Sequence, residues 1–267
     1  MRRLILRPGA IGDCLLALPA IEHLAASYTE VWISSAVVPL IRFADRVKPL
    51  SSTGVDLVGI DDLEPSPELF PYLQSFDSIV SWYGAARAEF RRALEATGVA
   101  CQFLPALPPA GYAGHATTFF TVQVGAPDGI PRVDITPACD SPAIIVHPFS
   151  GSAKKNWPLA NYRELAAKLP VKVGWSAGPE EQLAEARRFP SLAELASWLA
   201  GAGLYIGNDS GITHLAAAVG VPTLALFGPT DPAKWAPRGP NVTVLRSDPL
   251  EVLRVETVLQ TANRLLG

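Results

Sequence analysis

The feature that most constrains the fold is an alternation of short apolar runs with longer amphipathic runs, which is followed along most of the chain. Most of the apolar runs lead into a loop rich in Gly, Pro or Ser and then into a run with apolar residues at helical spacing. Strands that alternate with helices form parallel sheets with helices on both faces, so we expect a doubly wound α/β fold. The expected strands are 3–7, 31–34, 56–60, 78–82, 99–103, 143–147, 171–175, 204–206, 223–227 and 242–245.

The amphipathic runs predict the helices. One begins near Asp13, and Pro19 should bend or restart it because proline cannot donate a helical hydrogen bond. The remaining expected helices are 85–96, 158–168, 180–187, 191–199, 209–219 and 250–266.

The chain should form two domains. Its 267 residues fit either one large domain or two small ones. The segment 125–142 is punctuated by Gly and Pro, and the strand–loop–helix pattern restarts after it. We therefore expect domains at 1–124 and 143–267 with a linker at 125–142. Two similar domains facing a cleft are favoured over one continuous sheet.

Composition excludes several classes of protein. A net charge of −3 argues against a general nucleic-acid binder, which is usually strongly basic. Three widely spaced cysteines without a C-x-x-C pair suggest neither a disulfide framework nor a zinc site, and they are typical of a reducing cytoplasm. The histidines form no metal-binding spacing, so no metal is expected.

The N-terminus resembles a signal peptide, but Arg7, Pro8 and Asp13 interrupt the apolar region that such a peptide needs. No apolar run is long enough to span a membrane. We expect a cytoplasmic protein, and peripheral contact with the inner membrane surface stays open.

The first loop of interest is Gly9–Asp13. Its glycine spacing is not the G-x-G-x-x-G of a dinucleotide site, and no Gly-Lys-Ser/Thr follows for a Walker A loop. Asp13 has two interpretations. It is either a general base that faces the cleft or an N-cap of the helix that follows.

The second loop, Ser150–Pro158, contains Ser150, Gly151, Ser152 and Lys155. Small residues expose backbone N–H groups, hydroxyls donate hydrogen bonds and lysine supplies positive charge, which suits a phosphate. The alternative is a solvated basic turn before a helix.

The third loop, Gly207–His214, joins a strand to a helix. Asp209 is a candidate N-cap, and the N–H groups from Ser210 onward, including that of Gly211, favour an anion. His214 either donates to a phosphate or is a packed core histidine. Together with the second loop and Asp13, this loop suggests a diphosphate ligand and a reaction beside it.

These loops resemble glycosyltransferase family 9, the family of the ADP-heptose:lipopolysaccharide heptosyltransferases. The resemblance lies in the segments 11–20, 147–158, 207–217 and 220–232, of which D-S-G-x-x-H at Asp209–His214 with the following G-V-P and G-P-T is the most specific. The N-terminal half is short for such an enzyme.

The resemblance implies a GT-B fold with an acceptor-binding N-terminal half and a nucleotide-sugar-binding C-terminal half, whose last helix is a candidate to pack back on the N-terminal domain. It implies inverting, metal-independent sugar transfer to a glycan or glycolipid acceptor. It needs no cofactor, and ADP-heptose is one candidate donor. By position, Asp13 resembles the catalytic base. The donor-binding residues would be Ser150, Gly151, Ser152, Lys155, Asp209, Ser210, Gly211 and His214, and Glu181 or its neighbour Glu180 would contact the ribose.

Two alternatives stay open at this point. Another GT-B enzyme, such as a nucleotide-sugar epimerase, would share the donor loops and need no acceptor. A non-catalytic nucleotide-sugar-binding module would keep the second and third loops without needing Asp13. A nicotinamide oxidoreductase fits the fold class, but the chain lacks its glycine fingerprint.

Overall fold

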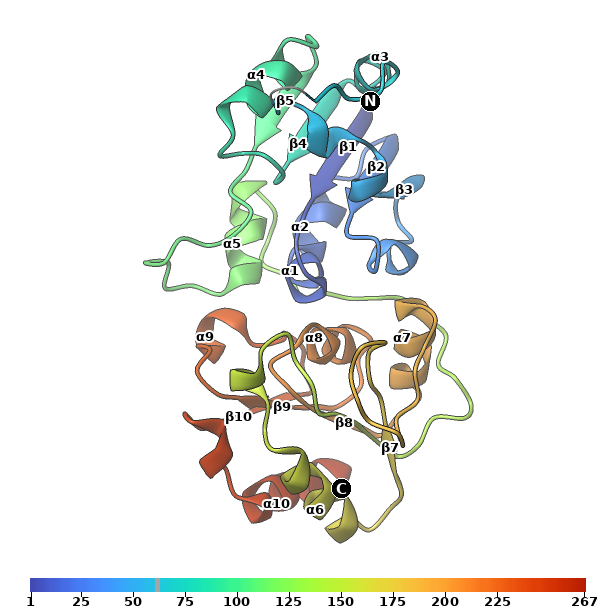
Figure 1. The fold of residues 1–267 in the computed structure, drawn as a ribbon, viewed down its shortest axis with the longest axis vertical. Helices are drawn as coiled ribbons and strands as arrows, with labels where there is room; N and C mark the ends of the chain where they lie inside the picture. Colours follow the sequence, from blue (N-terminus) through green and yellow to red (C-terminus); the bar gives the residue numbers. More distant parts are fainter. Residues whose placement is uncertain (61–62) are drawn as a thin grey trace. The chain divides into compact units, whose positions relative to one another are not determined.

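The computed structural model describes residues 1–60 and 63–267. These residues form two compact units, which are coloured along the sequence in Figure 1. The first unit comprises Met1–Tyr112 and Ala116–Gly129, and the second comprises Ala113–His115 and Ile130–Gly267. The short segment Ala113–His115 therefore packs with the second unit although it precedes the end of the first.

The first unit is built on a parallel sheet. Among the described residues its strands follow the order β3-β2-β1-β4-β5, and every pairing is parallel. Their bounds are β1 Arg2–Arg7, β2 Tyr28–Ile33, β3 Arg46–Pro49, β4 Ser78–Ser81 and β5 Ala100–Phe103.

The helices of the first unit bury apolar faces against this sheet. Leu4 and Leu6 of β1 pack with Phe90 and Leu94 of α4 and with Leu73 of α3. Helices α1, α2 and α5 contact one another. The break between α1 and α2 falls at Ala17, and Pro19 lies in the first turn of α2, as the sequence predicted. The helices are α1 Ile11–Leu16, α2 Leu18–His23, α3 Leu69–Leu73, α4 Ala88–Glu95 and α5 Ala116–Gln123.

The second unit repeats the plan with another strand order. Its described strands follow β10-β9-β8-β6-β7, again all parallel. The strands are β6 Ile144–His147, β7 Val173–Trp175, β8 Leu204–Asn208, β9 Thr223–Phe227 and β10 Val242–Arg246. The helices are α6 Leu159–Lys168, α7 Leu192–Ala200, α8 Gly211–Ala218, α9 Pro232–Trp235 and α10 Val255–Leu266.

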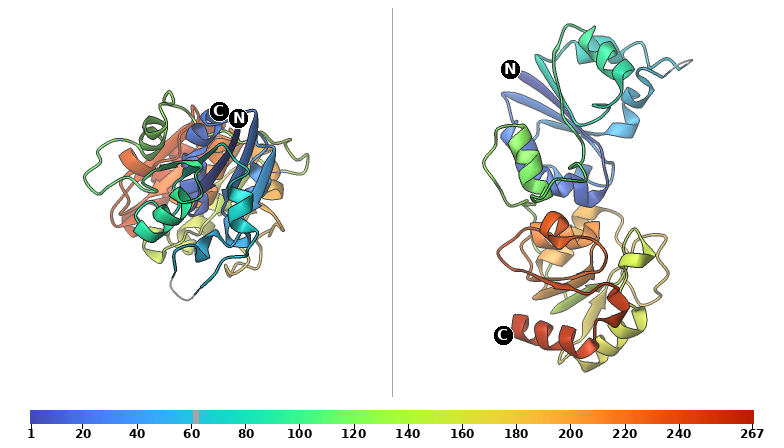
Figure 2. Two further views of the ribbon diagram at one scale, coloured as in Figure 1. Left: turned by 90° about the horizontal axis from the view of Figure 1, so that it is seen from above. Right: turned by 90° about the vertical axis from the view of Figure 1, so that its left-hand side faces the viewer.

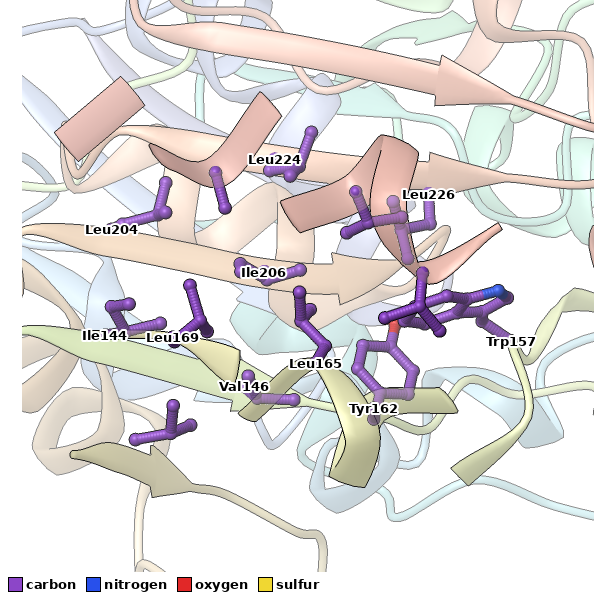
Figure 3. Packing of buried hydrophobic residues seen from close by; sticks show 14 of the residues in the cluster. Ile144, Val146, Trp157, Tyr162, Leu165, Leu169, Leu204, Ile206, Leu224 and Leu226 are labelled. Carbon is purple, nitrogen blue, oxygen red and sulfur yellow. The ribbon is translucent and has the colours of Figure 1, made fainter. Parts of the chain in front are cut away.

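Helices cover both faces of this second sheet. Helices α7 and α8 lie on one face and α6 and α10 on the other, where α6 and α10 lie side by side (Figures 1 and 2). The core between the sheet and α6 is drawn in Figure 3, where Ile206 and Val146 of the strands meet Tyr162 and Leu165 of the helix. No helix among residues 1–60 and 63–267 is long and apolar enough to cross a membrane.

One predicted strand is wrong. Residues 56–60 do not form a strand, and β3, which was not predicted, takes that place in the first sheet. Val55 and Val58 are both buried, three residues apart, which is the spacing of a 3-10 turn. Gly54 and Gly59 enclose this turn with φ values of 71° and 69°. The apolar pattern does not predict the edge strand β3, because Arg46, Lys48 and Pro49 give it a polar sequence that is common at sheet edges.

One predicted helix is also wrong. Residues 180–187 form turns, and Arg187 makes an isolated parallel bridge with Ser176. The carboxylate of Glu181 accepts a hydrogen bond from the backbone N–H of Gly178 (2.5 Å), which folds the segment back on itself. The short helices α3, α5 and α9 were not predicted.

The strand orders locate the place where each sheet can bind a ligand. In open parallel sheets, ligands bind beyond the carboxyl ends of the strands where the chain reverses its direction of progress across the sheet. That point lies between β1 and β4 in the first sheet and between β6 and β8 in the second. The loop with Asp13 follows β1, and the two other loops of interest follow β6 and β8.

Candidate functional site

The two loops of the second unit are joined by an ion pair. The Lys155 Nζ atom, in the loop after β6, lies 2.7 Å from Oδ2 of Asp209, which follows β8. The Asp209 side chain is almost completely buried, while 34% of the Lys155 side chain is exposed. The pair thus places a partly accessible ammonium group beside the N-terminus of α8.

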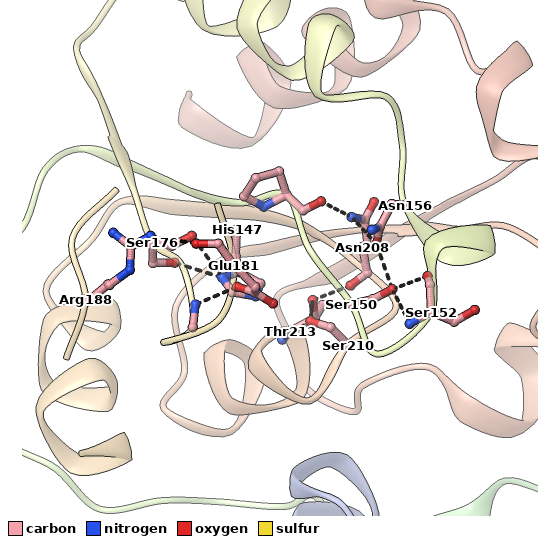
Figure 4. Close-up of polar contacts among 12 residues, drawn as sticks. His147, Ser150, Ser152, Asn156, Ser176, Glu181, Arg188, Asn208, Ser210 and Thr213 are labelled. Atoms are coloured by element: carbon pink, nitrogen blue, oxygen red, sulfur yellow. Dashed lines mark hydrogen bonds and ion pairs between the residues drawn. The ribbon is translucent and has the colours of Figure 1, made fainter. Parts of the chain in front are cut away.

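Asn208 holds the same two loops together through neutral hydrogen bonds. It is fully buried at the end of β8, and its Nδ2 donates to the backbone oxygen of Pro148 (2.8 Å). Its Oδ1 accepts from the backbone N–H of Trp157 (3.0 Å) and from the hydroxyl of Tyr162 (2.9 Å). Figure 4 shows Asn208 beside Asn156 and Ser150. Sequence reasoning did not assign Asn208 a role, although it lies within the third loop.

The N-terminus of α8 is capped by Ser210. Its hydroxyl accepts a hydrogen bond from the backbone N–H of Thr213 (3.3 Å), which is the usual serine cap. The prediction that Asp209 caps this helix is therefore wrong, because its carboxylate turns to Lys155 instead. Ser210 and Gly211 are both partly exposed at the first turn, where the helix dipole favours an anion.

His214 lies one turn into α8 and is 7% exposed. Burial lowers the pKa of His214 to about 4, because the protonated imidazole would lose its hydration. Asp209 acts in the opposite direction, whereas the positive charges of His115 and Lys155 lower the pKa further. The imidazole is therefore neutral at pH 7 and offers one N–H donor without a net charge.

The loop after β6 is only partly open. The hydroxyl of Ser150 contacts the backbone oxygen of Ser152 (2.8 Å) and Oδ1 of Asn156 (2.7 Å), so it takes part in the loop's own structure (Figure 4). Gly151 and Ser152 are exposed. A Cβ atom built on Gly151 would meet no other heavy atom within 4 Å, so the space beside this backbone is open.

Glu181 belongs to a polar cluster with His147, at the end of β6, and Ser176, which follows β7. Besides Gly178, its carboxylate lies 3.7 Å from Nε2 of His147, whose Nδ1 contacts the backbone oxygen of Ser176 at 3.1 Å (Figure 4). Burial lowers the pKa of His147, and the nearby Glu181 opposes that effect. Glu180 is exposed. Of the two acidic residues, Glu181 is the one that faces the unit's interior.

Asp13 lies in the first unit, at the third position of α1. The N-cap is Ala10, and its backbone N–H donates to Oδ2 of Asp13 (3.2 Å). Asp13 is therefore not the N-cap itself, but its carboxylate stabilises the helix start from within the first turn. Gly9 makes this possible, because its φ is 127° and a Cβ atom there would lie 3.0 Å from that of Asp13.

Comparison with known families shows to which family the chain belongs. The sequence model of glycosyltransferase family 9 (heptosyltransferase) matches residues 123–258, just over half of the 267 residues. The chain belongs to glycosyltransferase family 9. The matched region contains the loop after β6, the loop after β8 and Glu181.

A curated relative of this family 9 chain supports the same assignment. Lipopolysaccharide heptosyltransferase 1 of Pseudomonas aeruginosa is 39% identical over a 109-residue alignment, which covers 35% of this chain. The match covers 31% of that protein's length, so the chain corresponds to less than a third of it at the level of sequence.

Solved structures establish the fold of this family 9 chain. The structure of E. coli heptosyltransferase WaaC with ADP has a TM-score of 0.70 and 19% identity, and it covers 99% of this chain and 100% of its own. The structure of E. coli ADP-heptose lipopolysaccharide heptosyltransferase II has a TM-score of 0.73 and 17% identity, and covers 100% of this chain and 98% of its own. The predicted GT-B class, with two parallel-sheet α/β domains, is confirmed.

Proposed function

We propose that the protein transfers a sugar from a nucleotide diphosphate donor to a hydroxyl of a glycan or glycolipid acceptor. The observation that carries this proposal is the pairing of Lys155 with Asp209 at 2.7 Å. It brings together two loops with exposed or partly exposed residues at the strand reversal of the second sheet, within the segment that matches the family. Heptose is the favoured sugar, since the relatives are named heptosyltransferases and one is described with ADP.

The second unit would hold the donor diphosphate. Lys155 would place its ammonium group against the phosphate oxygens, and Ser150, Gly151 and Ser152 would offer backbone N–H groups. On the other loop, Ser210, Gly211 and the neutral His214 would donate from the start of α8, with Asp209 orienting Lys155. Glu181 would reach the ribose after a rearrangement that releases Gly178. These groups would stabilise the charge that develops on the departing diphosphate without a metal ion or a cofactor.

The first unit would bind the acceptor and supply the base. Asp13 would take the proton of the acceptor hydroxyl as its oxygen attacks the anomeric carbon from the face opposite the diphosphate. The bond from the anomeric carbon to the diphosphate oxygen breaks, and the diphosphate leaves with the electron pair. The sugar's configuration is inverted in this single displacement. An acceptor that carries a lipid would bring the enzyme to the inner membrane surface from the cytoplasmic side.

A thermal-shift screen against ADP, GDP, UDP and TDP and their sugars tests the donor assignment. A ligand that binds only the folded state raises the unfolding temperature by mass action, so one nucleotide should produce a clear shift. ADP and ADP-heptose are expected to produce it. If none of the ligands raised the unfolding temperature, the proposal would be contradicted. Product analysis with the winning donor then separates transfer to an acceptor from epimerisation of the donor sugar.

A further inference from the structure

Arg7 is a buried cation at the end of β1 for which the proposed chemistry has no direct use. Its side chain is fully inaccessible to solvent. One terminal nitrogen donates to the backbone oxygen of Asp13 (2.8 Å), and the other donates to the backbone oxygen of Ala106 (3.1 Å). The guanidinium group therefore joins the loop that carries Asp13 to the loop that follows β5.

The environment of this guanidinium is unusual for a structural arginine. Among the described residues, no close ion pair joins it to a carboxylate, although the Asp13 carboxylate attracts it at longer range, and its Nε atom is buried without a hydrogen-bond partner. Its close contacts are with two carbonyl oxygens and with the ring of Phe120, whose centre lies 4.5 Å from the guanidinium carbon. An apolar residue of similar volume would fill this place at a lower desolvation cost. Stability alone therefore does not account for a charge here.

The contacts of Arg7 continue into a wider network. The Trp82 ring, 5.9 Å from the guanidinium carbon, donates through Nε1 to the Gln123 side chain (2.6 Å), and Gln123 donates to the backbone oxygen of Pro105 (3.0 Å). Trp82, Pro105 and Ala106 also line a cavity of about 800 Å³, which extends along β5 and α4 and past the end of β4. The residues that fix the Asp13 loop thus also fix one wall of this cavity.

We propose that Arg7 is a positioning residue, which holds the backbone of Asp13 at a fixed place relative to the cavity wall at Ala106. This inference rests on the proposed role of Asp13 as the general base. Two hydrogen bonds to carbonyl oxygens on different loops fix a distance that neither loop fixes alone. A displacement of about 1 Å at a catalytic group lowers the rate on the order of a hundredfold. The gain in rate from fixing this distance therefore outweighs the desolvation cost of burying the Arg7 charge.

The test compares Arg7→Ala and Arg7→Lys with Arg3→Ala in the full chain. Arg3 is a matched control, because it lies on the same strand and also donates to a backbone oxygen, that of Leu24 (2.8 Å). ADP-heptose serves as the donor, lipopolysaccharide that lacks heptose serves as the acceptor, and release of ADP is measured. Arg7→Ala should lower kcat on the order of a hundredfold, while calorimetric affinity for ADP stays the same. Arg7→Lys keeps the charge and one donor and should lose less.

Two further measurements separate positioning from folding. Guanidinium added far below denaturing concentrations should raise the turnover of Arg7→Ala and leave that of Asp13→Asn unchanged. Amide hydrogen exchange at 9–14 and 104–106 should speed up in both Arg7 variants and not in Arg3→Ala. Turnover and exchange in the Arg7 variants equal to those of Arg3→Ala would overturn the inference. Full turnover in Asp13→Asn would instead overturn the proposed function, and the exchange measurement would still decide whether Arg7 holds the loop.

Discussion

A single lysine carries much of the proposed donor affinity. Lys155→Ala removes the ammonium group beside the start of α8, and the affinity for ADP should fall roughly ten- to a hundredfold, since a hydrogen bond to a charged group is worth about 1.5–3 kcal/mol. Isothermal calorimetry measures the loss.

The neighbouring Lys154 provides the control for that experiment, because it is exposed and adjacent in sequence. Lys154→Ala should leave the affinity unchanged. Lys155→Ala also leaves the buried carboxylate of Asp209 without its cation, so its unfolding temperature should fall and must be measured alongside. Equal affinities for both variants would exclude Lys155 from the donor site.

The protonation of His214 makes stability depend on pH in a defined direction. Its pKa is about 4 in the folded chain and near 6.5 in an unfolded one, so the unfolded state binds the proton first as the pH falls. The free energy of unfolding should therefore decrease between pH 6.5 and pH 4 and level off below, by on the order of 3 kcal/mol from this residue. Urea unfolding of the wild type and of His214→Gln measures the difference, with His23→Gln at an exposed site as the control. If the free energy of unfolding changed equally with pH in the wild type and in His214→Gln, this assignment would be contradicted.

At the scale of elements, the start of α8 has a structural role, the serine cap, and a proposed role in donor binding. Ser210 caps α8 and Ser191 caps α7 with nearly the same backbone geometry, φ −146° and ψ 162° against φ −144° and ψ 156°. Each Ser→Ala substitution should cost about 1 kcal/mol of stability. Only Ser210→Ala should also weaken ADP binding, because only α8 begins beside Lys155. A loss of ADP affinity in both variants, or in neither, would remove the start of α8 from the donor site.

The elements that could be predicted from sequence are those with a strong local pattern. Buried parallel strands such as β6, β8 and β9 are continuous apolar runs, and helices such as α6 and α10 show one apolar face. Short elements with polar sequences, such as β3, were missed because tertiary pairing rather than propensity makes them strands. The turns at 180–187 depend on contacts with Ser176 and Gly178, which no local pattern encodes.

The site was predictable to the extent that it lies on loops of unusual composition. The loops with Lys155 and with Asp209 were identified separately, but their direct pairing depends on β6 and β8 being neighbours in the sheet. The role of Asn208 follows from the same adjacency, since it spans both loops from a buried position. The assignment of Asp209 as a cap failed because a serine one residue later suits that position and leaves the carboxylate for the lysine.

At the scale of the whole molecule, the two units are assigned different tasks, and this assignment is open to a direct test. ADP should slow amide hydrogen exchange in 148–156 and 208–214 and in the strands of the second sheet, because a bound ligand stabilises the unit that holds it. The core strands of the first unit should be unaffected. Protection that appears mainly at 9–16 and in β1 would place the nucleotide in the first unit and reverse the assignment.

The most direct measurement is heptose transfer from ADP-heptose by the wild type and by Asp13→Asn, with ADP affinity measured on both. The amide oxygen of asparagine can still accept the hydrogen bond from Ala10, so the variant should fold normally. We predict that it binds ADP as the wild type does and that its turnover falls by roughly 10²- to 10⁴-fold, the usual contribution of a general base. Turnover at the wild-type rate in Asp13→Asn would contradict the account.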